Sequence, residues 1–271
     1  MRQVNQLTRI LPKSALVLLL LPGVASSGNK AQPVQSTSAN GSVSEQFLLD
    51  AANRDRASRG LKPLQRDPVL AEAALYHARI MAQHADISHG FPGEPDLAAR
   101  AANAGVHFSL VTENVAEAPD PSEIHDMWMH SEHHRENLLD PYVNVIGISI
   151  VQRGGQFYAV EDFASTVEVL TFDQQESAVA SLVKASGIVI DAAEPSIRSA
   201  RVTCSMPTGY AEGARKPWFV MRYTASNLGE LPTALRTRIS SGKYHQAVVG
   251  ACKSEQDSPF TAYNIAVLLY P

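Results

Sequence analysis

The hydrophobic pattern of this 271-residue chain changes its period near Pro141. Before that proline, apolar residues recur at the three- and four-residue spacing of amphipathic helices. After it, apolar and polar residues alternate over 143–151 and 157–163, and the Gly154-Gly155 pair between them is typical of a hairpin turn. Helices followed by a hairpin predict an α+β unit, in which helices pack on an antiparallel sheet.

Capping residues mark where the helices of this unit begin and end. Asp67 followed by Pro68 is a strong helix start, and Asp120 followed by Pro121 is another. Glycine just past a helical stretch is typical of a helix end, as at Gly60. The signals predict helices over 45–57, from Pro68 through the apolar stretch beyond it, over 97–104 and from Pro121 onward.

The composition shifts after Phe163, and we expect a second, smaller, β-rich domain there. Its pattern predicts one helix over 174–185 and strands over 201–205, 218–224, 235–239, 245–251 and 262–270. The domains expected from these patterns span 45–166 and 173–271, and no internal repeat is visible in the sequence.

The N-terminus has the pattern of a secretory signal peptide. Arg2, Arg9 and Lys13 precede an apolar run over 15–21, which ends at Pro22 and small residues. The run is too short for the roughly 20 residues of a membrane-spanning helix. We therefore expect a signal peptide at 1–26, a flexible linker at 27–44, and a secreted protein, extracellular or periplasmic, without an integral membrane segment in the mature chain.

Charge and cysteine content narrow the classes of function. Without residues 1–26 the chain has 20 Lys and Arg against 27 Asp and Glu, a formal charge of −7. A net acidic chain without a basic cluster repels phosphate, so we do not expect this protein to bind nucleic acid. Its two cysteines, Cys204 and Cys252, are expected to form a disulfide if the chain is exported, with two free thiols as the alternative.

Four short motifs occur in a fixed order along the first part of the chain: SHG at 88–90, TENVA at 112–116, MWMHSEHHRENLL at 127–139, and VNVIGISIV leading to FYAVEDFA. Together with the opening LLDAANRDRASRGLKPLQRDP, they resemble the CAP superfamily, also called the SCP or pathogenesis-related-protein-like family. The resemblance is to its bacterial secreted branch and covers roughly residues 43–164. The C-terminal part from about Val167 lies outside it.

The resemblance implies an α-β-α sandwich around an antiparallel sheet, with a cleft that holds two histidines and two acids. Matched by motif, the histidines are His89 and His134, and the first acid is Glu113. Ser131 stands where relatives with a full tetrad have the second acid, and this departure puts the family's function in doubt for this chain. Asn114, Arg135 and Asn137 match the surrounding motifs as supporting residues.

Two interpretations of this cleft stay open. His89 and His134, with Glu113, could hold a divalent ion such as Zn²⁺, because imidazole and carboxylate are zinc ligands. Alternatively, the same side chains form hydrogen bonds that organise the cleft without a metal. The sequence therefore establishes no cofactor, and Zn²⁺ is the one candidate.

A catalytic interpretation is weaker. Ser131 and His134 are three residues apart, so on a continuous helix they would share one face, and Glu113 could orient the histidine as in a hydrolase triad. The sequence has no Gly-x-Ser-x-Gly motif, however. We expect a non-catalytic module that binds a small molecule, a lipid or a cell-surface component; a metal-assisted or serine-type hydrolase and an envelope-docking protein are the alternatives.

The other histidines carry weaker signals. His77 lies on the apolar stripe of its helix and is interpreted as a satisfied core histidine. His130 precedes His134 by four residues, a spacing used by helical metal pairs, but no H-E-x-x-H motif is present. The remaining histidines without a partner pattern are expected to be exposed: His84, His107, His125 and His245.

Overall fold

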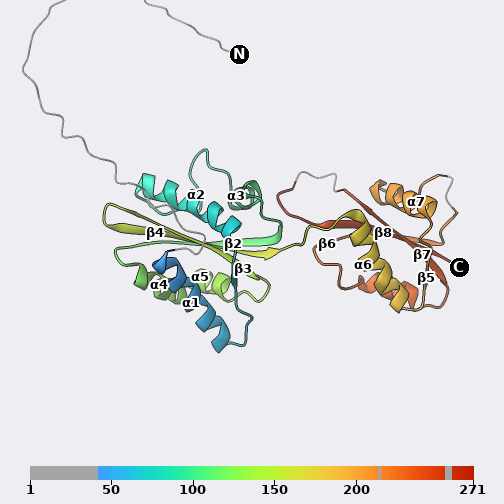
Figure 1. Cartoon of the computed structure of the whole chain (residues 1–271), viewed down its shortest axis with the longest axis horizontal. Coiled ribbons are helices and arrows are strands. Elements are labelled where there is room, and N and C mark those ends of the chain that lie inside the picture. The colour runs from blue at the N-terminus through green and yellow to red at the C-terminus, as the bar shows by residue number, and fades with distance from the viewer. Residues whose placement is uncertain (1–41, 213–214, 254–257) are drawn as a thin grey trace, which may run out of the picture. The chain divides into compact units, whose positions relative to one another are not determined.

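The computed structural model describes residues 42–212, 215–253 and 258–271 (Figure 1). The predicted signal peptide at 1–26 and most of the predicted linker lie outside the described residues. The end of that linker prediction is wrong, because helix α1 (Val43–Ser58) already contains residues 43 and 44. Ser42 and Glu45 form a reciprocal capping box, which starts the helix within the polar stretch that we assigned to the linker.

The expected helix ends are present in the first part of the chain. Strand β1 (Gln65–Arg66) leads into α2 (Pro68–His84), and the Asp67 side chain accepts from the backbone N–H groups of Val69 and Leu70. Helix α3 (Leu97–Ala104) ends at Gly105, which has a left-handed conformation typical of a glycine at a helix end. The remaining elements of this part are β2 (Phe108–Ala118), the 3-10 turn η1 (Pro121–Glu123), α4 (Ile124–His130), α5 (Glu132–Leu138), β3 (Val145–Arg153) and β4 (Gln156–Thr166).

The first sheet has the strand order β1-β3-β4-β2. Strands β3 and β4 form the predicted hairpin, β2 pairs antiparallel with β4, and β1 adds in parallel to β3. Helices cover both faces of the sheet, with α2 and α3 on one face and α1, α4 and α5 on the other (Figure 1). This is the three-layer sandwich that the resemblance implied.

The second half of the described chain also has helices and a sheet. Its elements are α6 (Phe172–Ala185), β5 (Val189–Ile190), α7 (Glu194–Ser205), β6 (Phe219–Ala225), α8 (Thr233–Ile239), β7 (Gln246–Cys252) and β8 (Tyr263–Tyr270). The expected helix and three of the expected strands are confirmed. The strands expected over 201–205 and 235–239 are wrong, because both segments are helical.

Short length explains both errors. Residues 201–205 are the last turns of α7, and their β-branched residues Val202 and Thr203 favour a strand only when the preceding turns are ignored. In α8 the buried residues Leu235 and Ile239 are four residues apart, which is the spacing of one helical face. A window of five residues cannot distinguish these patterns by periodicity, so flanking sequence and packing decide.

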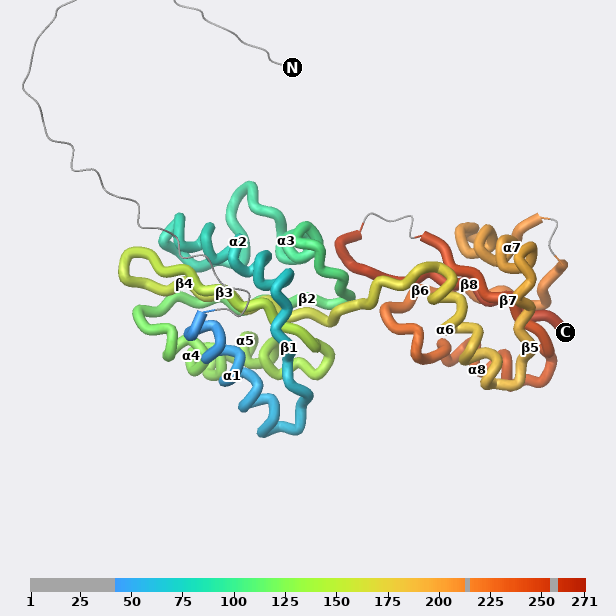
Figure 2. The backbone as a smooth tube through the Cα atoms, viewed as in Figure 1, coloured from blue at the N-terminus to red at the C-terminus, as the bar shows by residue number. Residues whose placement is uncertain are grey.

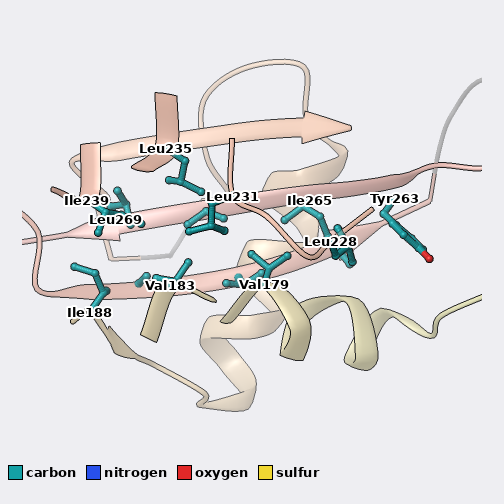
Figure 3. Packing of buried hydrophobic residues seen from close by; sticks show 14 of the residues in the cluster. Val179, Val183, Ile188, Leu228, Leu231, Leu235, Ile239, Tyr263, Ile265 and Leu269 are labelled. Carbon is teal, nitrogen blue, oxygen red and sulfur yellow. The ribbon is translucent and has the colours of Figure 1, made fainter. Parts of the chain in front are cut away.

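The second sheet has the order β5-β7-β8-β6, with α7 on one face and α6 and α8 on the other (Figure 2). Val179 and Val183 of α6 and Leu235 of α8 pack against Ile265 and Leu269 of β8 (Figure 3). The predicted boundary between 166 and 173 stays a prediction. A disulfide joins Cys204 and Cys252, as expected, but Cys204 lies on helix α7 rather than on a strand.

The two sheets have the same topology. In each, the first strand pairs in parallel with the third, the third and fourth are antiparallel neighbours, and the second strand forms the far edge beside the fourth. In each, a helix backbone also lies directly against a glycine of the third strand. A Cβ on Gly147 would lie 2.4 Å from the Leu70 carbonyl carbon of α2, and one on Gly250 would lie 2.3 Å from that of Ala200 in α7.

No helix within the described segments combines the length and the apolar character needed to cross a bilayer.

Candidate functional site

The loop after α2 brings His89 onto β2. His89 Nδ1 lies 2.9 Å from Glu113 Oε1, which joins two of the residues that the motifs predicted for the cleft. The His89 side chain is 63% exposed, whereas that of Glu113 is 2% exposed. Hydrogen bonding to the Glu113 carboxylate raises the pKa of His89, and burial opposes it only in part. The site therefore presents an imidazole that gains protons readily, anchored on a buried acid.

A buried network of charges lies behind Glu113. Arg100 of α3 forms an ion pair with Glu113 and places its Nη1 3.4 Å from Glu94 Oε1. His77 of α2 connects to Glu94 through Nδ1 at 2.7 Å, and its Nε2 donates to the Ser88 carbonyl, also at 2.7 Å. The interpretation of His77 as a satisfied core histidine is confirmed, and its hydrogen bonds additionally fix the loop that carries His89.

Strand β4 supplies two further buried acids, one on each face of the sheet. Asp162 is the β4 partner of Glu113, and the neighbouring Glu161 is the partner of Asn114 on the opposite face. Burial raises the pKa of both carboxyls well above the ordinary range, and for Asp162 the negative charge of Glu113 adds to the effect. A protonated Asp162 keeps a further negative charge out of the group formed by Glu94 and Glu113.

Helix α5, which carries His134, is hydrogen-bonded to the edge strand β2. Asn137 Nδ2 donates to the Glu113 carbonyl at 3.1 Å and to Asn114 Oδ1 at 3.0 Å, while Asn114 Nδ2 donates to the His134 carbonyl at 3.0 Å. Trp128 of α4 donates from Nε1 to the Val115 carbonyl, also at 3.0 Å. Side chains thus occupy the edge groups that another strand would otherwise bind. The supporting positions that the motifs indicated for Asn114 and Asn137 are those that hold the α5 segment.

The environment of His134 contrasts with that of His89. Burial lowers the pKa of His134, and the positive charge of His89 lowers it further. The site therefore combines one imidazole whose surroundings favour protonation with one whose surroundings oppose it.

Ser131 does not share a helical face with His134. Its backbone is extended, with φ −94° and ψ 126°, so it ends α4 and precedes α5. Its side chain makes no capping hydrogen bond, although its carbonyl accepts from the Arg135 N–H. Arg135 Nη1 donates to the Met129 carbonyl across the same break. The geometry assumed for a Ser131–His134 pair on one continuous helix is therefore wrong.

Most of the other histidines are where the sequence placed them. His84, His107 and His245 are exposed. His125 is a correction, because it is buried and its Nε2 lies 2.8 Å from Asp55 Oδ2 of α1. The spacing gave no signal for this contact, since His125 and Asp55 are 70 residues apart.

His89, Glu113 and His134 do not match a zinc site with three protein ligands. Across residues 42–212, 215–253 and 258–271, no group of three His, Cys, Asp or Glu side chains is arranged to hold a metal ion. His89 Nδ1 is hydrogen-bonded to Glu113, so only its Nε2 is available to bind a metal ion. Two histidine nitrogens would need water or a ligand to complete a tetrahedral shell. The alternative of cleft-organising hydrogen bonds fits the observed contacts better.

Sequence reasoning missed the second layer of this site. Glu94, Arg100 and Asp162 are charged residues within stretches of mainly small or apolar residues. A charge in such a stretch was the one sign in the sequence that these side chains could be buried and functional. An arginine in the alanine-rich α3 and two acids within the apolar β4 are unusual for buried elements unless they are paired.

Comparison with known proteins agrees with this architecture. The sequence model of the Cysteine-rich secretory protein family, CAP, matches residues 49–168. Residues 49–168 form a CAP domain. An uncharacterized protein of Bacillus subtilis, YkwD, is 33% identical over 122 residues, which are 44% of this chain and 48% of that protein. The chain thus spans about half the length of this curated relative.

Two solved structures are similar to part of this chain. An extracellular protein of Bacillus anthracis that contains an SCP domain is 26% identical, with a TM-score of 0.41, over 45% of this chain and 40% of that chain. An outer surface protein of Borrelia burgdorferi is 20% identical, with a TM-score of 0.43, over 45% of this chain and 92% of that chain.

Proposed function

We propose that the CAP domain is a non-catalytic, extracellular binding module, and that its ligand contacts the cleft formed by His89, Glu113 and His134. The observation that carries this proposal is the exposed His89 imidazole, which is fixed by the buried Glu113 and backed by the Arg100–Glu94–His77 network. Fixed polar groups at a surface bind a ligand with little loss of side-chain entropy.

The electrostatics of the cleft support a ligand with both donor and acceptor groups. A protonated His89 donates a hydrogen bond, whereas a neutral His134 ring offers one donor and one acceptor. A small polar molecule or the headgroup of a lipid has such groups. Export rests on the signal-peptide pattern at 1–26 and on the Cys204–Cys252 disulfide, which is typical of oxidising compartments.

Hydrolysis is the weaker candidate. A serine hydrolase needs the serine oxygen within hydrogen-bond reach of its base. Ser131 instead sits at the break between α4 and α5, and its hydroxyl has no hydrogen bond to His134 among the contacts of residues 42–212.

Saturation-transfer NMR on the mature protein tests the proposal, with a library of small amides, carboxylates and soluble lipid headgroups as probes. Ligands of the cleft should bind the wild-type protein and lose binding in the His89→Ala/His134→Ala variant. The matched control is His130→Ala/His133→Ala, because these side chains are 78% and 92% exposed on the same segment. The control should bind as the wild type does.

Two results would contradict the proposal. Binding that is equal in both double variants would place the ligand elsewhere. Turnover of an ester or peptide substrate that disappears in Ser131→Ala would show that the cleft is catalytic.

A further inference from the structure

Seven elements of the second half correspond in order to elements of the CAP domain, whereas α3 and η1 have no counterpart among the described residues. Apart from those two, the order helix, short strand, helix, edge strand, helix, hairpin applies to both, so α6, β5, α7, β6, α8, β7 and β8 take the places of α1, β1, α2, β2, α4/α5, β3 and β4. A backbone hydrogen bond next to the first strand of each sheet is also the same in both. After the parallel first strand, the Asp67 N–H donates to the Ile146 carbonyl and the Asp191 N–H donates to the Ala247 carbonyl, each at 2.9 Å.

The strand registers identify which residue replaces Glu113. In the CAP domain, one row across the sheet runs from Gly147 through Asp162 to Glu113. In the second sheet, the row that starts at the corresponding glycine contains Gly250, Ala266 and Arg222. Both rows lie on the face covered by the helix that contacts the glycine. Arg222 therefore occupies the place of Glu113, and an alanine replaces the buried Asp162.

The replacement reverses the charge at this place in the fold. Arg222 donates from Nε to the Thr203 carbonyl at 2.7 Å and from Nη2 to the Gly209 carbonyl at 2.6 Å. These bonds orient the guanidinium and leave its Nη1 without a hydrogen-bond partner in the described part of the chain. In the CAP domain the corresponding group is a buried carboxylate.

Arg222 lines a cavity of about 970 Å³. Lys253 adds a second cation, and the Cys204–Cys252 disulfide forms part of the wall. No Asp or Glu from the described residues lines it. The acids at the start of α6, Asp173 and Glu176, both pair with Arg201, so they do not neutralise these cations.

Gln175 of α6 forms part of the cavity wall, although its Oε1 is buried away from solvent. Gln175 is 6% exposed, and its Nε2 donates to the Leu170 carbonyl. The remaining wall includes apolar side chains such as Phe172, Met206 and Ile265.

We propose that this cavity is a second binding site, which takes a small molecule that carries a carboxylate, as the carboxyl end of a peptide does. Arg222 and Lys253 bind the carboxylate, because a cation and an anion form a charge-assisted hydrogen bond. The volume is in the range of pockets for ligands of several hundred daltons, which accommodates three residues of a peptide.

Isothermal titration calorimetry of the full mature protein tests the proposal with two probes, N-acetyl-Ala-Ala-Ala and its C-terminal amide. The free acid should bind one site per chain, and the amide should bind at least about tenfold more weakly because it lacks the charge. Lys253→Gln and Arg222→Gln should each weaken binding of the acid by at least about tenfold.

The controls separate this site from the cleft and from general charge effects. Arg198→Gln removes an arginine from the exposed side of α7, where its side chain is 73% exposed, and should leave binding unchanged. His89→Ala/His134→Ala should also bind the acid as the wild type does, so the two proposals can fail independently. Lys253 is exposed, so Lys253→Gln decides the test even if Arg222→Gln disturbs the end of α7. The proposal is overturned if the acid does not bind, if acid and amide bind equally, or if Lys253→Gln binds as the wild type does.

Discussion

His89 and Glu113 show how one contact sets the chemistry of a residue. His89 is exposed and would ordinarily titrate as a free histidine, but the carboxylate that accepts its Nδ1–H favours the charged form. The Glu113 side chain is in turn held by Arg100 of α3. A property of the surface therefore depends on groups that are buried beneath it.

The titration of the two cleft histidines is the first prediction. His89 should have its NMR midpoint above that of an ordinary histidine and His134 below it. Replacement of His89 by glutamine removes a positive charge near His134, so the midpoint of His134 should rise toward the ordinary value. The same change at the distant, exposed His245 is the control and should alter neither midpoint. A midpoint of His134 that does not respond to His89→Gln would contradict the coupling.

The sign of the effect on stability follows from linkage. His89 binds its proton more tightly in the folded state, so its contribution to stability is complete below its unfolded pKa of about 6.5 and disappears as the pH rises through the folded value. For His134 the order is reversed. Its folded pKa is lowered, so its contribution is present at high pH and is lost as the pH falls.

Arg56 is the residue on which the ends of α1 and α5 depend. It is 1% exposed and donates to three backbone carbonyls: Lys62, Leu138 and Asp140. Arg56→Ala should lower the free energy of unfolding by about 3 kcal/mol, because buried carbonyls lose their donors and a cavity remains. Urea unfolding measures the loss. Arg54→Ala, an exposed arginine of the same helix, is the control, and a similar loss in both variants would contradict the argument.

Among the elements, the two strands that contact helix backbones are the most sensitive to added volume. The Gly147 and Gly250 positions have no room for a Cβ, since the nearest atoms are backbone atoms of α2 and α7. Gly147→Ala and Gly250→Ala should each destabilise the protein by about 2 kcal/mol or more, because the helix must move away from its sheet. Thermal unfolding followed by circular dichroism checks the result.

Gly90→Ala provides the control for these substitutions. Gly90 is in the exposed loop next to His89, and a Cβ there would have open space. Its effect should stay within about 0.5 kcal/mol. If Gly250→Ala were as mild as Gly90→Ala, the close approach of α7 to β7 would be wrong, and with it the correspondence between the two sheets.

For the whole molecule, the disulfide is the strongest link within the second sheet and its helices. Cys204 and Cys252 are separated by 48 residues, and the chain-entropy relation gives about 4 kcal/mol for a loop of this length. The Cys204→Ser/Cys252→Ser variant should therefore have a free energy of unfolding about 4 kcal/mol lower than that of the wild type. Its urea unfolding midpoint should be correspondingly lower. Non-reducing mass analysis of the exported protein should find no free thiol, and two free thiols would contradict the bond.

The sequence by itself determined much of the CAP domain. Capping pairs such as Asp67 with Pro68 act within a few residues, so they specify where helices begin regardless of the rest of the chain. The alternating pattern around Gly154-Gly155 specified the β3–β4 hairpin for the same reason. The motif order indicated His89 and Glu113 as candidate site residues, and the fold brings these two side chains into contact.

The tertiary structure alone decided the contacts between distant segments. The charged groups behind the site, such as Arg100 and Asp162, are separated in sequence. They lie together because α3 packs beside β2 and because Asp162 of β4 pairs with Glu113 of β2, and the spacing of charges along the sequence does not indicate this. The equivalence of the two sheets is also invisible in the sequence, where no repeat can be seen. Strand order and register depend on which backbones pair across the molecule, and many side-chain sequences satisfy the same pairing. The charge at the position of Glu113 can therefore reverse to Arg222 while the topology stays the same.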